Sequence, residues 1–219
     1  MTSVRDPAKF PTLYYEQNLW MTGFTQVAGI DEAGRGAWAG PVCAAAVILP
    51  PDPTLIQTLN DVRDSKLMTP PARETWAPRI RAASQAWGVG FASSQEIDTL
   101  GILPATKLAA ARALAALSSL TFASPDPLIP DYLLTDYLIF PNIDLPQTAL
   151  IKGDRLSLSI AAASVLAKTS RDALMRKVDA VYPDYGFARH KGYGTSIHQQ
   201  AIRRLGLCEI HRKSFSIPV

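Results

Sequence analysis

The amino-acid sequence predicts an α/β domain in which helices cover a mixed β-sheet. Two short apolar runs with strand character come close together near the start, and later runs alternate with segments of helical periodicity. A paired start followed by this alternation is typical of a mixed sheet flanked by helices. The chain has 219 residues, of which 47% are hydrophobic, so it is long and apolar enough to bury one full core.

Five segments are predicted to be strands. The first two are joined by a glycine-rich turn and are expected to form a hairpin. Proline-rich loops separate the later ones. The predicted strands are residues 26–32, 41–49, 87–93, 131–136 and 147–152.

Four segments are predicted to be helices. The clearest is LPATKLAAARALAALSSL, which repeats apolar residues with a helical period and is rich in strong helix formers. Ser93 and Glu96 have the spacing of a capping box, which predicts a short helical turn before that segment. The predicted helices are residues 71–84, 103–119, 158–181 and 195–205.

The composition excludes several classes of protein. The first 20 residues contain acids and prolines but no apolar core, so they do not resemble a signal peptide. The longest apolar stretches are far shorter than the roughly 20 residues that a membrane span needs. The two cysteines, Cys43 and Cys208, form neither a disulfide framework nor a metal-binding spacing. We therefore expect a soluble cytoplasmic protein with no membrane partner, and a monomer because nothing demands an oligomer.

The charge is unevenly distributed along the chain. Residues 1–150 contain 10 Lys and Arg against 14 Asp and Glu, whereas residues 151–219 contain 12 against 5, together with all three histidines. A basic C-terminal third suggests a polyanionic partner, most commonly nucleic acid. Charge alone is equally compatible with a solvated basic face that has no partner.

Four acidic residues stand at the ends of predicted strands. Asp31 and Glu32 end the first strand, Asp136 ends YLLTD, and Asp154 follows TALIK through the turn residue Gly153. Carboxylates at the ends of neighbouring strands can meet at one edge of a sheet, where they repel each other unless they share protons or bind cations. Oxygen ligands favour Mg²⁺ or Mn²⁺, which are typical of phosphoryl-transfer sites.

A purely structural interpretation of these acids stays open at this point. A single aspartate at a strand end is more often a turn former or a helix cap than a ligand. Asp31 and Glu32 need not share a ligand, because neighbours in a strand point to opposite faces. Roughly a hundred residues separate this pair from the other two acids, so spacing does not show that they meet.

The turn Gly34–Arg35–Gly36 directly follows the first two acids. Glycine lets successive backbone N–H groups point at an anion and lets a bulky ligand approach the chain closely. Arginine adds a charged fork that suits phosphate. Metal-binding acids beside such a turn indicate phosphodiester chemistry, although the tripeptide by itself is a weak motif.

Together these motifs resemble the ribonuclease HII family, the type 2 ribonucleases H. The segment VAGIDEAGRGAWAGPVCAAAVIL carries the family's hallmark, and the likeness covers roughly residues 26–215 in the family's order. We accordingly divide the chain into an N-terminal arm (1–25), a catalytic domain (26–215) and a tail (216–219). The other matching segments are DSK (64–66), EIDTLGILPAT (96–106), YLLTD (132–136), KGD with SIAAASVLAKTSRD (152–172), YPDYGFARHKGYGT (182–195) and HRKSF (211–215).

The resemblance implies a ribonuclease H-like fold, with a C-terminal helical region that contributes to substrate binding. It assigns Asp31, Glu32, Asp136 and Asp154 as the catalytic acids that hold two divalent ions, Mn²⁺ or Mg²⁺. Two such ions can activate a water and stabilise the departing oxygen of an in-line displacement.

The resemblance also implies a set of substrate-binding residues. Gly34, Arg35 and Gly36 would grip the backbone where a ribonucleotide meets the next deoxynucleotide, and Tyr193 would pack on the deoxyribose. Lys66 would lie near the substrate phosphate. Judged alone, Lys66 is better interpreted as a solvated loop lysine, and Tyr193 is compatible with an ordinary loop aromatic. The loop histidine His190 is left out of the site.

The implied function is an endonuclease that cuts the RNA strand of RNA–DNA hybrids and incises 5′ of single ribonucleotides in duplex DNA. Such cuts leave 3′-hydroxyl and 5′-phosphate ends and serve RNA-primer removal and ribonucleotide excision repair. Ribonuclease HIII is an alternative, but Arg35 and the short lead before Asp31 argue against it. A non-catalytic hybrid-binding module is another alternative, which the four intact acids disfavour.

Three positions depart from the family's pattern. Tyr137 follows Asp136 where glycine is usual, so the loop beyond that acid is expected to differ. The usual DSKKL is DSKLM, which removes one lysine, and Gly101 replaces a common asparagine.

Overall fold

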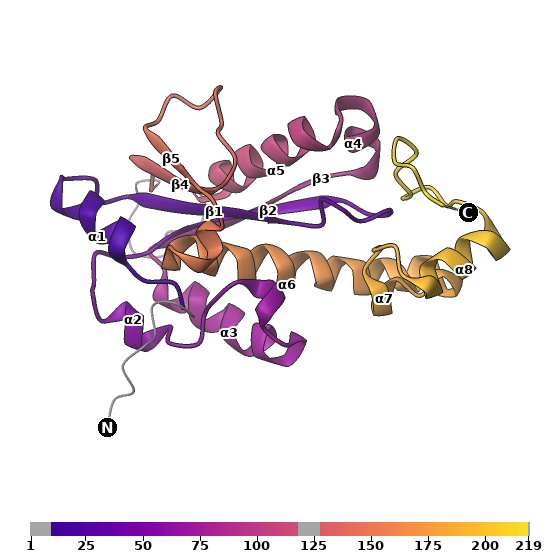
Figure 1. Ribbon diagram of the computed structural model, residues 1–219, viewed down its shortest axis with the longest axis horizontal. Coiled ribbons are helices and arrows are strands. Elements are labelled where there is room, and N and C mark those ends of the chain that lie inside the picture. Colours follow the sequence, from indigo (N-terminus) through magenta and orange to yellow (C-terminus); the bar gives the residue numbers. More distant parts are fainter. Residues whose placement is uncertain (1–9, 118–127, 219) are drawn as a thin grey trace.

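The computed structural model describes residues 10–117 and 128–218 (Figure 1). Its elements in chain order are α1 (Tyr14–Met21), β1 (Val27–Ala33), β2 (Val42–Ile48), α2 (Leu55–Thr58), the 3₁₀ helix η1 (Ser65–Leu67), α3 (Pro70–Ala83), β3 (Ala86–Ala92), α4 (Ser94–Leu100), α5 (Ile102–Leu117), β4 (Tyr132–Asp136), β5 (Gln147–Leu150), η2 (Gly153–Arg155), α6 (Leu158–Val181), η3 (Pro183–Tyr185), α7 (Phe187–His190) and α8 (Ser196–Leu205).

The strands form one mixed sheet in the order β3-β2-β1-β4-β5. β1 and β2 are the predicted antiparallel hairpin, and β3 extends it on the far side of β2. β4 and β5 are added parallel to β1. The predicted fold class is therefore confirmed, and most element ends agree with the prediction to within one or two residues.

Helices cover both faces of the sheet (Figure 1). All seven residues of β2 are buried, because the strand is central and both of its faces are covered. One face packs against α6 and α3, and the other packs against α5. On the α5 side, a β-carbon at Gly90 would lie 2.2 Å from the Ala109 carbonyl oxygen, so glycine permits this close packing. Two apolar layers thus hold the sheet rigidly in place.

The register of the parallel strands determines where the predicted acids lie. Ile30 pairs with Thr135, so the next residues, Asp31 and Asp136, emerge at the same end of adjacent strands. Asp136 in turn pairs with Leu150, the last residue of β5, and Asp154 follows in η2. The carboxyl ends of β1, β4 and β5 therefore bring three predicted acids to one edge of the sheet.

Some elements differ from the prediction or were not foreseen. β5 ends at Leu150 rather than at residue 152, because Lys152 adopts a left-handed conformation with φ 59° that starts η2. Ser93 and Glu96 form the expected capping box, but it begins a two-turn helix, α4, rather than a single turn. Residues 118–119 of the predicted second helix lie outside the described residues.

The segment predicted as an N-terminal arm contains the unforeseen helix α1. Its Glu16 is buried, and one carboxylate oxygen accepts hydrogen bonds from the Ser157 hydroxyl (2.6 Å) and from the backbone N–H (2.9 Å) and hydroxyl (2.7 Å) of Ser159. Burial raises the pKa of Glu16, while these hydrogen bonds act in the opposite direction. α1 is thus tied to the start of α6. Across the described residues, no helix has both the length and the apolar character needed to cross a membrane.

Candidate active site

Three carboxylates meet at the edge of the sheet. Asp31, Asp136 and Asp154 each place one carboxylate oxygen within 4.8 Å of the others. They come from β1, from the end of β4 and from η2, and Asp31 and Asp154 are almost fully buried. Buried carboxylates at this spacing repel one another strongly unless a proton or a cation is present.

The surroundings of Asp31 fit a bound cation. Its Oδ1 accepts a hydrogen bond from the backbone N–H of Glu32 at 2.7 Å, but its buried Oδ2 has no hydrogen-bond partner among the described residues. Burial, followed by the charges of Glu32 and Asp136, raises the pKa of Asp31 well above its usual value. A buried carboxylate oxygen without a donor costs free energy unless a ligand satisfies it, and a hard divalent ion is the natural ligand.

Asp136 and Asp154 are held in place by the turn after β5. The backbone N–H of Gly153 donates a hydrogen bond of 2.8 Å to Oδ1 of Asp136, so the turn that carries Asp154 is fixed against the end of β4. Burial, and then the charges of Asp64 and Asp136, raise the pKa of Asp154 to about 6. The charge of the nearby Lys66 acts in the opposite direction but does not cancel the effects of burial and the neighbouring carboxylates.

The fourth predicted acid, Glu32, lies outside this three-carboxylate cluster. Its carboxylate instead forms an ion pair of 3.1 Å with Arg35. This follows from strand geometry, since Glu32 and Asp31 are consecutive residues of β1 and point to opposite faces. Burial raises the pKa of Glu32 against the opposing effect of Arg35, and the charge of Asp136 adds to the increase. Glu32 therefore interacts electrostatically with the cluster, but its role as a metal ligand stays a prediction.

A fifth carboxylate, Asp64, was missed as a candidate site residue. It is buried at the start of η1, where Oδ1 accepts the backbone N–H of Lys66 at 2.9 Å. Its Oδ2 forms an ion pair of 3.3 Å with Arg155, the residue after Asp154. The DSK segment contained the signal, but a buried role for its aspartate depends on contacts between distant parts of the chain.

The Gly34–Arg35–Gly36 turn is held from behind by two buried arginines that sequence reasoning also missed. Arg212 donates hydrogen bonds to the carbonyl oxygens of Gly34 (2.7 Å) and Arg35 (2.8 Å). Arg171 lies directly against Gly34, which has φ 92°, and a β-carbon there would come within 2.0 Å of the Arg171 Nε. Both arginines are fully buried. Glycine therefore makes this conformation of the turn possible, and the two arginines stabilise it.

A groove of about 510 Å³ joins this turn to the other predicted substrate-binding residues. It brings together Gly34, Arg35, Gly36, Lys66 and Tyr193 from three distant parts of the chain. The remaining residues that line it are Glu32, Ala33, Ser65, Ile102, Lys168 and Phe215.

Lys66 supplies positive charge between the groove and the acids. Burial acts to lower the pKa of Lys66, but the charges of Asp31, Asp64, Asp154 and Asp136 outweigh this effect, and the pKa is raised. The ammonium group is therefore held charged by the acidic edge. This arrangement suits a group that meets an anionic substrate beside the carboxylates.

Tyr193 lies opposite the Gly34–Arg35–Gly36 turn, with its ring close to two cations. The Lys168 Nζ lies 5.2 Å and the Arg171 Cζ 5.3 Å from the ring centroid. Behind the tyrosine, His198 Nδ1 hydrogen-bonds the Tyr193 carbonyl oxygen at 3.0 Å, and His198 Nε2 lies 3.0 Å from His211 Nε2. These contacts support the loop that presents the ring.

His190, which the sequence analysis left out of the site, is buried behind the same loop. Its ring stacks on that of His198 with centroids 4.3 Å apart. Its Nδ1 accepts the backbone N–H of Gly192, and Nε2 hydrogen-bonds the Tyr185 carbonyl oxygen at 2.8 Å. His190 thus supports the Tyr193 loop from within the C-terminal region.

Solved structures share this arrangement of strands and helices. Ribonuclease H2 from Pyrococcus horikoshii matches with a TM-score of 0.66 and 25% identity, over 88% of this chain and 94% of that one. The ribonuclease HII in a PCNA complex from Archaeoglobus fulgidus matches with a TM-score of 0.70 and 23% identity, over 89% and 96% of the two chains. The fold is therefore that of the type 2 ribonucleases H.

Sequence comparisons assign the chain to one family within this fold. The family model for ribonuclease HII matches residues 28–217. Ribonuclease HII from Synechococcus sp. is 49% identical over 94% of this chain and 88% of its own length, and that from Syntrophotalea carbinolica is 51% identical over 93% and 91%. The chain belongs to the ribonuclease HII family, and it is accordingly an endonuclease that hydrolyses phosphodiester bonds.

Proposed function

We propose that this enzyme cuts the RNA strand of RNA–DNA hybrids and incises 5′ of single ribonucleotides in duplex DNA, leaving 3′-hydroxyl and 5′-phosphate ends. Membership of the ribonuclease HII family supports the ribonuclease activity. The observation that carries the finer proposal is the cluster of Asp31, Asp136 and Asp154 beside the groove lined by the Gly34–Arg35–Gly36 turn. These cuts would serve RNA-primer removal and ribonucleotide excision repair.

The acids fit a pair of divalent ions. We propose that Asp31, Glu32, Asp136 and Asp154 would hold Mn²⁺ or Mg²⁺, in keeping with the unpaired, buried Oδ2 of Asp31. When bound, two such ions supply Lewis-acid stabilisation of the attacking and leaving oxygens of an in-line displacement. The protein's own part is to hold the carboxylates close together and oriented at one edge of a rigid sheet.

The groove is suited to a junction between RNA and DNA. The Gly34–Arg35–Gly36 backbone is proposed to contact the 2′-hydroxyl, the group that distinguishes RNA from DNA. Lys66, kept charged by the acids, is proposed to meet the adjacent phosphate. Tyr193 offers an aromatic face to the deoxyribose on the DNA side. The basic C-terminal third is expected to contribute to the affinity for the duplex, and this contribution should weaken as the salt concentration rises.

We further propose that the enzyme works as a monomer in the cytoplasm, with residues 26–215 as its catalytic domain. The groove and the carboxylate cluster are both formed within a single chain. Cys43 and Cys208 are both free thiols, as expected of a protein in a reducing compartment.

A cleavage assay tests the proposal. The substrates are a duplex with one embedded ribonucleotide, a long RNA–DNA hybrid and an all-DNA duplex of the same sequence, each incubated with Mn²⁺, Mg²⁺ or a chelator. Cleavage of the first two substrates, 5′ of the ribonucleotide and only with metal, is the expected result. The all-DNA duplex should stay intact, because it offers no 2′-hydroxyl.

The same assay distinguishes the alternative of a binding module. If duplex binding persists while neither metal supports cleavage, the proposed enzymatic function is wrong. Cleavage of hybrids without cleavage at single ribonucleotides would contradict only the junction-reading part. Products with 3′-phosphate ends would exclude the proposed displacement, which leaves the phosphate on the 5′ end.

A further inference from the structure

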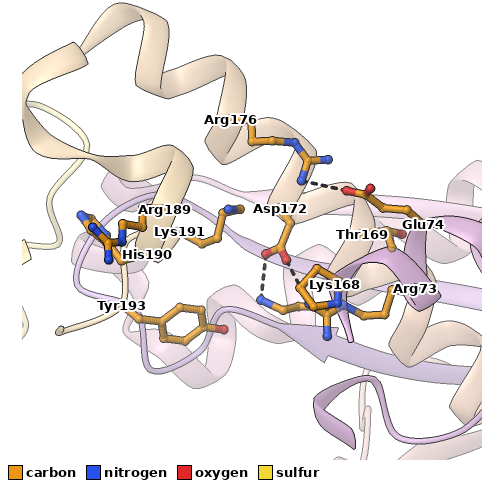
Figure 2. Close-up of a pocket in the computed structure, with 11 residues that line it drawn as sticks. Arg73, Glu74, Lys168, Thr169, Asp172, Arg176, Arg189, His190, Lys191 and Tyr193 are labelled. Carbon is orange, nitrogen blue, oxygen red and sulfur yellow. Dashed lines mark hydrogen bonds and ion pairs between the residues drawn. The ribbon is translucent and has the colours of Figure 1, made fainter. Parts of the chain in front are cut away.

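A second pocket lies next to the groove, on the side away from the Gly34–Arg35–Gly36 turn. Its volume is about 220 Å³, roughly seven times the volume per molecule in liquid water. Figure 2 shows its walls: side chains of α3 and α6 face the segment that runs from α7 through Tyr193. We call this cavity the basic pocket.

The basic pocket carries an excess of positive charge. Five basic side chains line it against two acidic ones, Glu74 and Asp172, which leaves three positive charges in excess. The acids are already paired, as the dashed lines in Figure 2 show. The five basic side chains are Arg73, Lys168, Arg176, Arg189 and Lys191.

The pairing leaves the positive charge concentrated on one wall. Asp172 binds Lys168 at 2.8 Å and Arg73 at 3.7 Å, and Glu74 binds Arg176 at 3.1 Å. The cations of the opposite wall have no carboxylate in ion-pair contact among the described residues.

Those cations are Arg189 and Lys191, neither of which forms an ion pair with any residue that the structure describes. Lys191 is only partly exposed, and its Nζ donates to the carbonyl oxygen of Ala188. Burial lowers the pKa of Lys191, the charge of Asp172 opposes this shift, and the charges of Arg176 and Lys168 lower the pKa further against a weaker opposing effect of Asp179. An anion placed among these three cations would relieve their mutual repulsion.

The basic pocket adjoins the groove. Lys168 and Tyr193 line both cavities, so a chain that leaves the groove past the tyrosine ring enters the basic pocket next. Arg171 fixes this boundary from behind by donating a hydrogen bond of 2.9 Å to the carbonyl oxygen of Lys191. The two cavities therefore lie side by side, where an extended polyanion can reach both.

We propose that the basic pocket is a phosphate subsite, which holds a backbone phosphate of the substrate on the DNA side of the junction, beyond the sugar that packs on Tyr193. The inference rests on the proposed function for the direction of the strand. Lys191 and Arg189 contact the phosphate, while Lys168 links the subsite to the groove. Such a contact positions the duplex and carries no sequence information.

The test is a binding experiment in a chelator, so that turnover plays no part. Single-ribonucleotide duplexes carry one neutral methylphosphonate at successive positions on the DNA side, and affinity is measured by fluorescence anisotropy. We expect one position at which the neutral linkage weakens binding by about tenfold in the unmodified protein. Lys191→Gln should weaken binding of the all-phosphate duplex by a similar factor. The affinity of this variant should then be the same whether that one linkage is a phosphate or a methylphosphonate.

The matched control is Lys177→Gln, which removes the same charge from an exposed position of α6 outside the basic pocket. It should respond to every methylphosphonate as the unmodified protein does. Arg189→Gln provides a second variant at the subsite, and urea unfolding of each variant verifies that it is folded. Lys191→Gln should also reduce the slope of log affinity against log salt by about one.

Two outcomes would overturn the subsite. The first is that the methylphosphonate losses are the same in Lys191→Gln as in the unmodified protein at every position. The second is a specific effect of inorganic phosphate without any effect of a backbone linkage. Inorganic phosphate, compared with chloride at equal ionic strength, would weaken duplex binding by the unmodified protein but not by Lys191→Gln, and no methylphosphonate position would distinguish the two proteins. The pocket would then bind free phosphate rather than a backbone phosphate. Neither outcome bears on cleavage, whose absence would instead contradict the proposed function.

Discussion

The guanidinium of Arg212 donates a hydrogen bond of 2.7 Å to the carbonyl oxygen of Gly34, although 178 residues separate the two positions. A second nitrogen of the same side chain binds the Arg35 carbonyl oxygen, and Nε binds that of Gly40 at 3.0 Å. The C-terminal HRKSF segment thus holds the turn that follows the first two acids. The loop next to the candidate metal site is preorganised by a residue from the other end of the chain.

Arg212→Lys should therefore lower the free energy of unfolding by about 3 kcal/mol, because an ammonium group cannot reproduce three fork-like hydrogen bonds to buried carbonyl oxygens. Urea denaturation measures the loss. Arg203→Lys, the same exchange at an exposed position of α8, should change stability by no more than about 0.5 kcal/mol. Equal stability of the two variants would mean that Arg212 does not hold the turn.

Gly34→Ala and Gly36→Ala should have very different effects although they lie in one turn. At Gly34 a β-carbon would clash with Arg171 and the φ of 92° disfavours alanine, so we expect a loss of about 2–4 kcal/mol. At Gly36 φ is not positive and no described atom lies within 4 Å of the β-carbon position, so stability should be nearly unchanged. Thermal unfolding of both variants provides the measurement, and a Gly34→Ala variant as stable as the unmodified protein would contradict the close contact between Gly34 and Arg171.

Tyr137→Gly should raise stability by about 0.5–1 kcal/mol. Tyr137 has φ 64°, a left-handed conformation that costs a non-glycine residue more than glycine loses in unfolded-state entropy. Its side chain is 67% exposed, so little packing is lost. The control is Ile139→Gly, at an exposed position without positive φ, which should be destabilising. A loss of stability in Tyr137→Gly would show that its side chain contributes more than its backbone strain costs.

Asp136→Asn should reduce cleavage by about 100-fold or more and largely retain duplex affinity, because it removes one charge from the carboxylate cluster while keeping an acceptor for the Gly153 N–H. Mn²⁺ should also raise the melting temperature of the unmodified protein more than that of the variant. Asp144→Asn, at an exposed position of the loop between β4 and β5, is the matched control. Normal turnover in Asp136→Asn would remove this residue from the site.

His198→Asn should change the pH dependence of stability. Burial, with the charges of His190 and His211, lowers the pKa of His198 to about 4. The unfolded chain therefore binds more protons than the folded one between pH 4 and about 6.5, and stability is lost as pH falls through that window. Asparagine keeps a donor for the Tyr193 carbonyl oxygen but does not titrate.

The measurement is urea unfolding of both proteins from pH 7.5 to pH 4.5. The stability difference between unmodified protein and His198→Asn should shift by about 2–3 kcal/mol in favour of the variant as pH falls. Groups that do not contact His198 titrate equally in both proteins and cancel in this difference. A difference that does not vary with pH would mean that His198 is not held neutral by its surroundings.

Much of the fold and several site residues could be predicted from the sequence, because the signals are local. Apolar runs, helical periodicity and the Ser93–Glu96 capping box depend on neighbours within a few positions, and the predicted sheet and hairpin are confirmed. Several site residues could be predicted because they belong to short motifs that are contiguous in sequence. Gly34 and Gly36 lie in DEAGRG, and Asp136 ends YLLTD.

Only the tertiary structure decided which residues meet. Asp31, Asp136 and Asp154 lie together because β1, β4 and β5 are parallel and in register. Glu32 points toward Arg35 instead, because alternate residues of a strand face opposite sides of the sheet.

Arg171 and Arg212 support the Gly34 turn because α6 and the HRKSF segment pack against it. Local sequence determines elements and motifs, whereas contacts across more than a hundred residues depend on how those elements pack. The sequence by itself therefore determined the class of chemistry, and packing decided the geometry in which it is arranged.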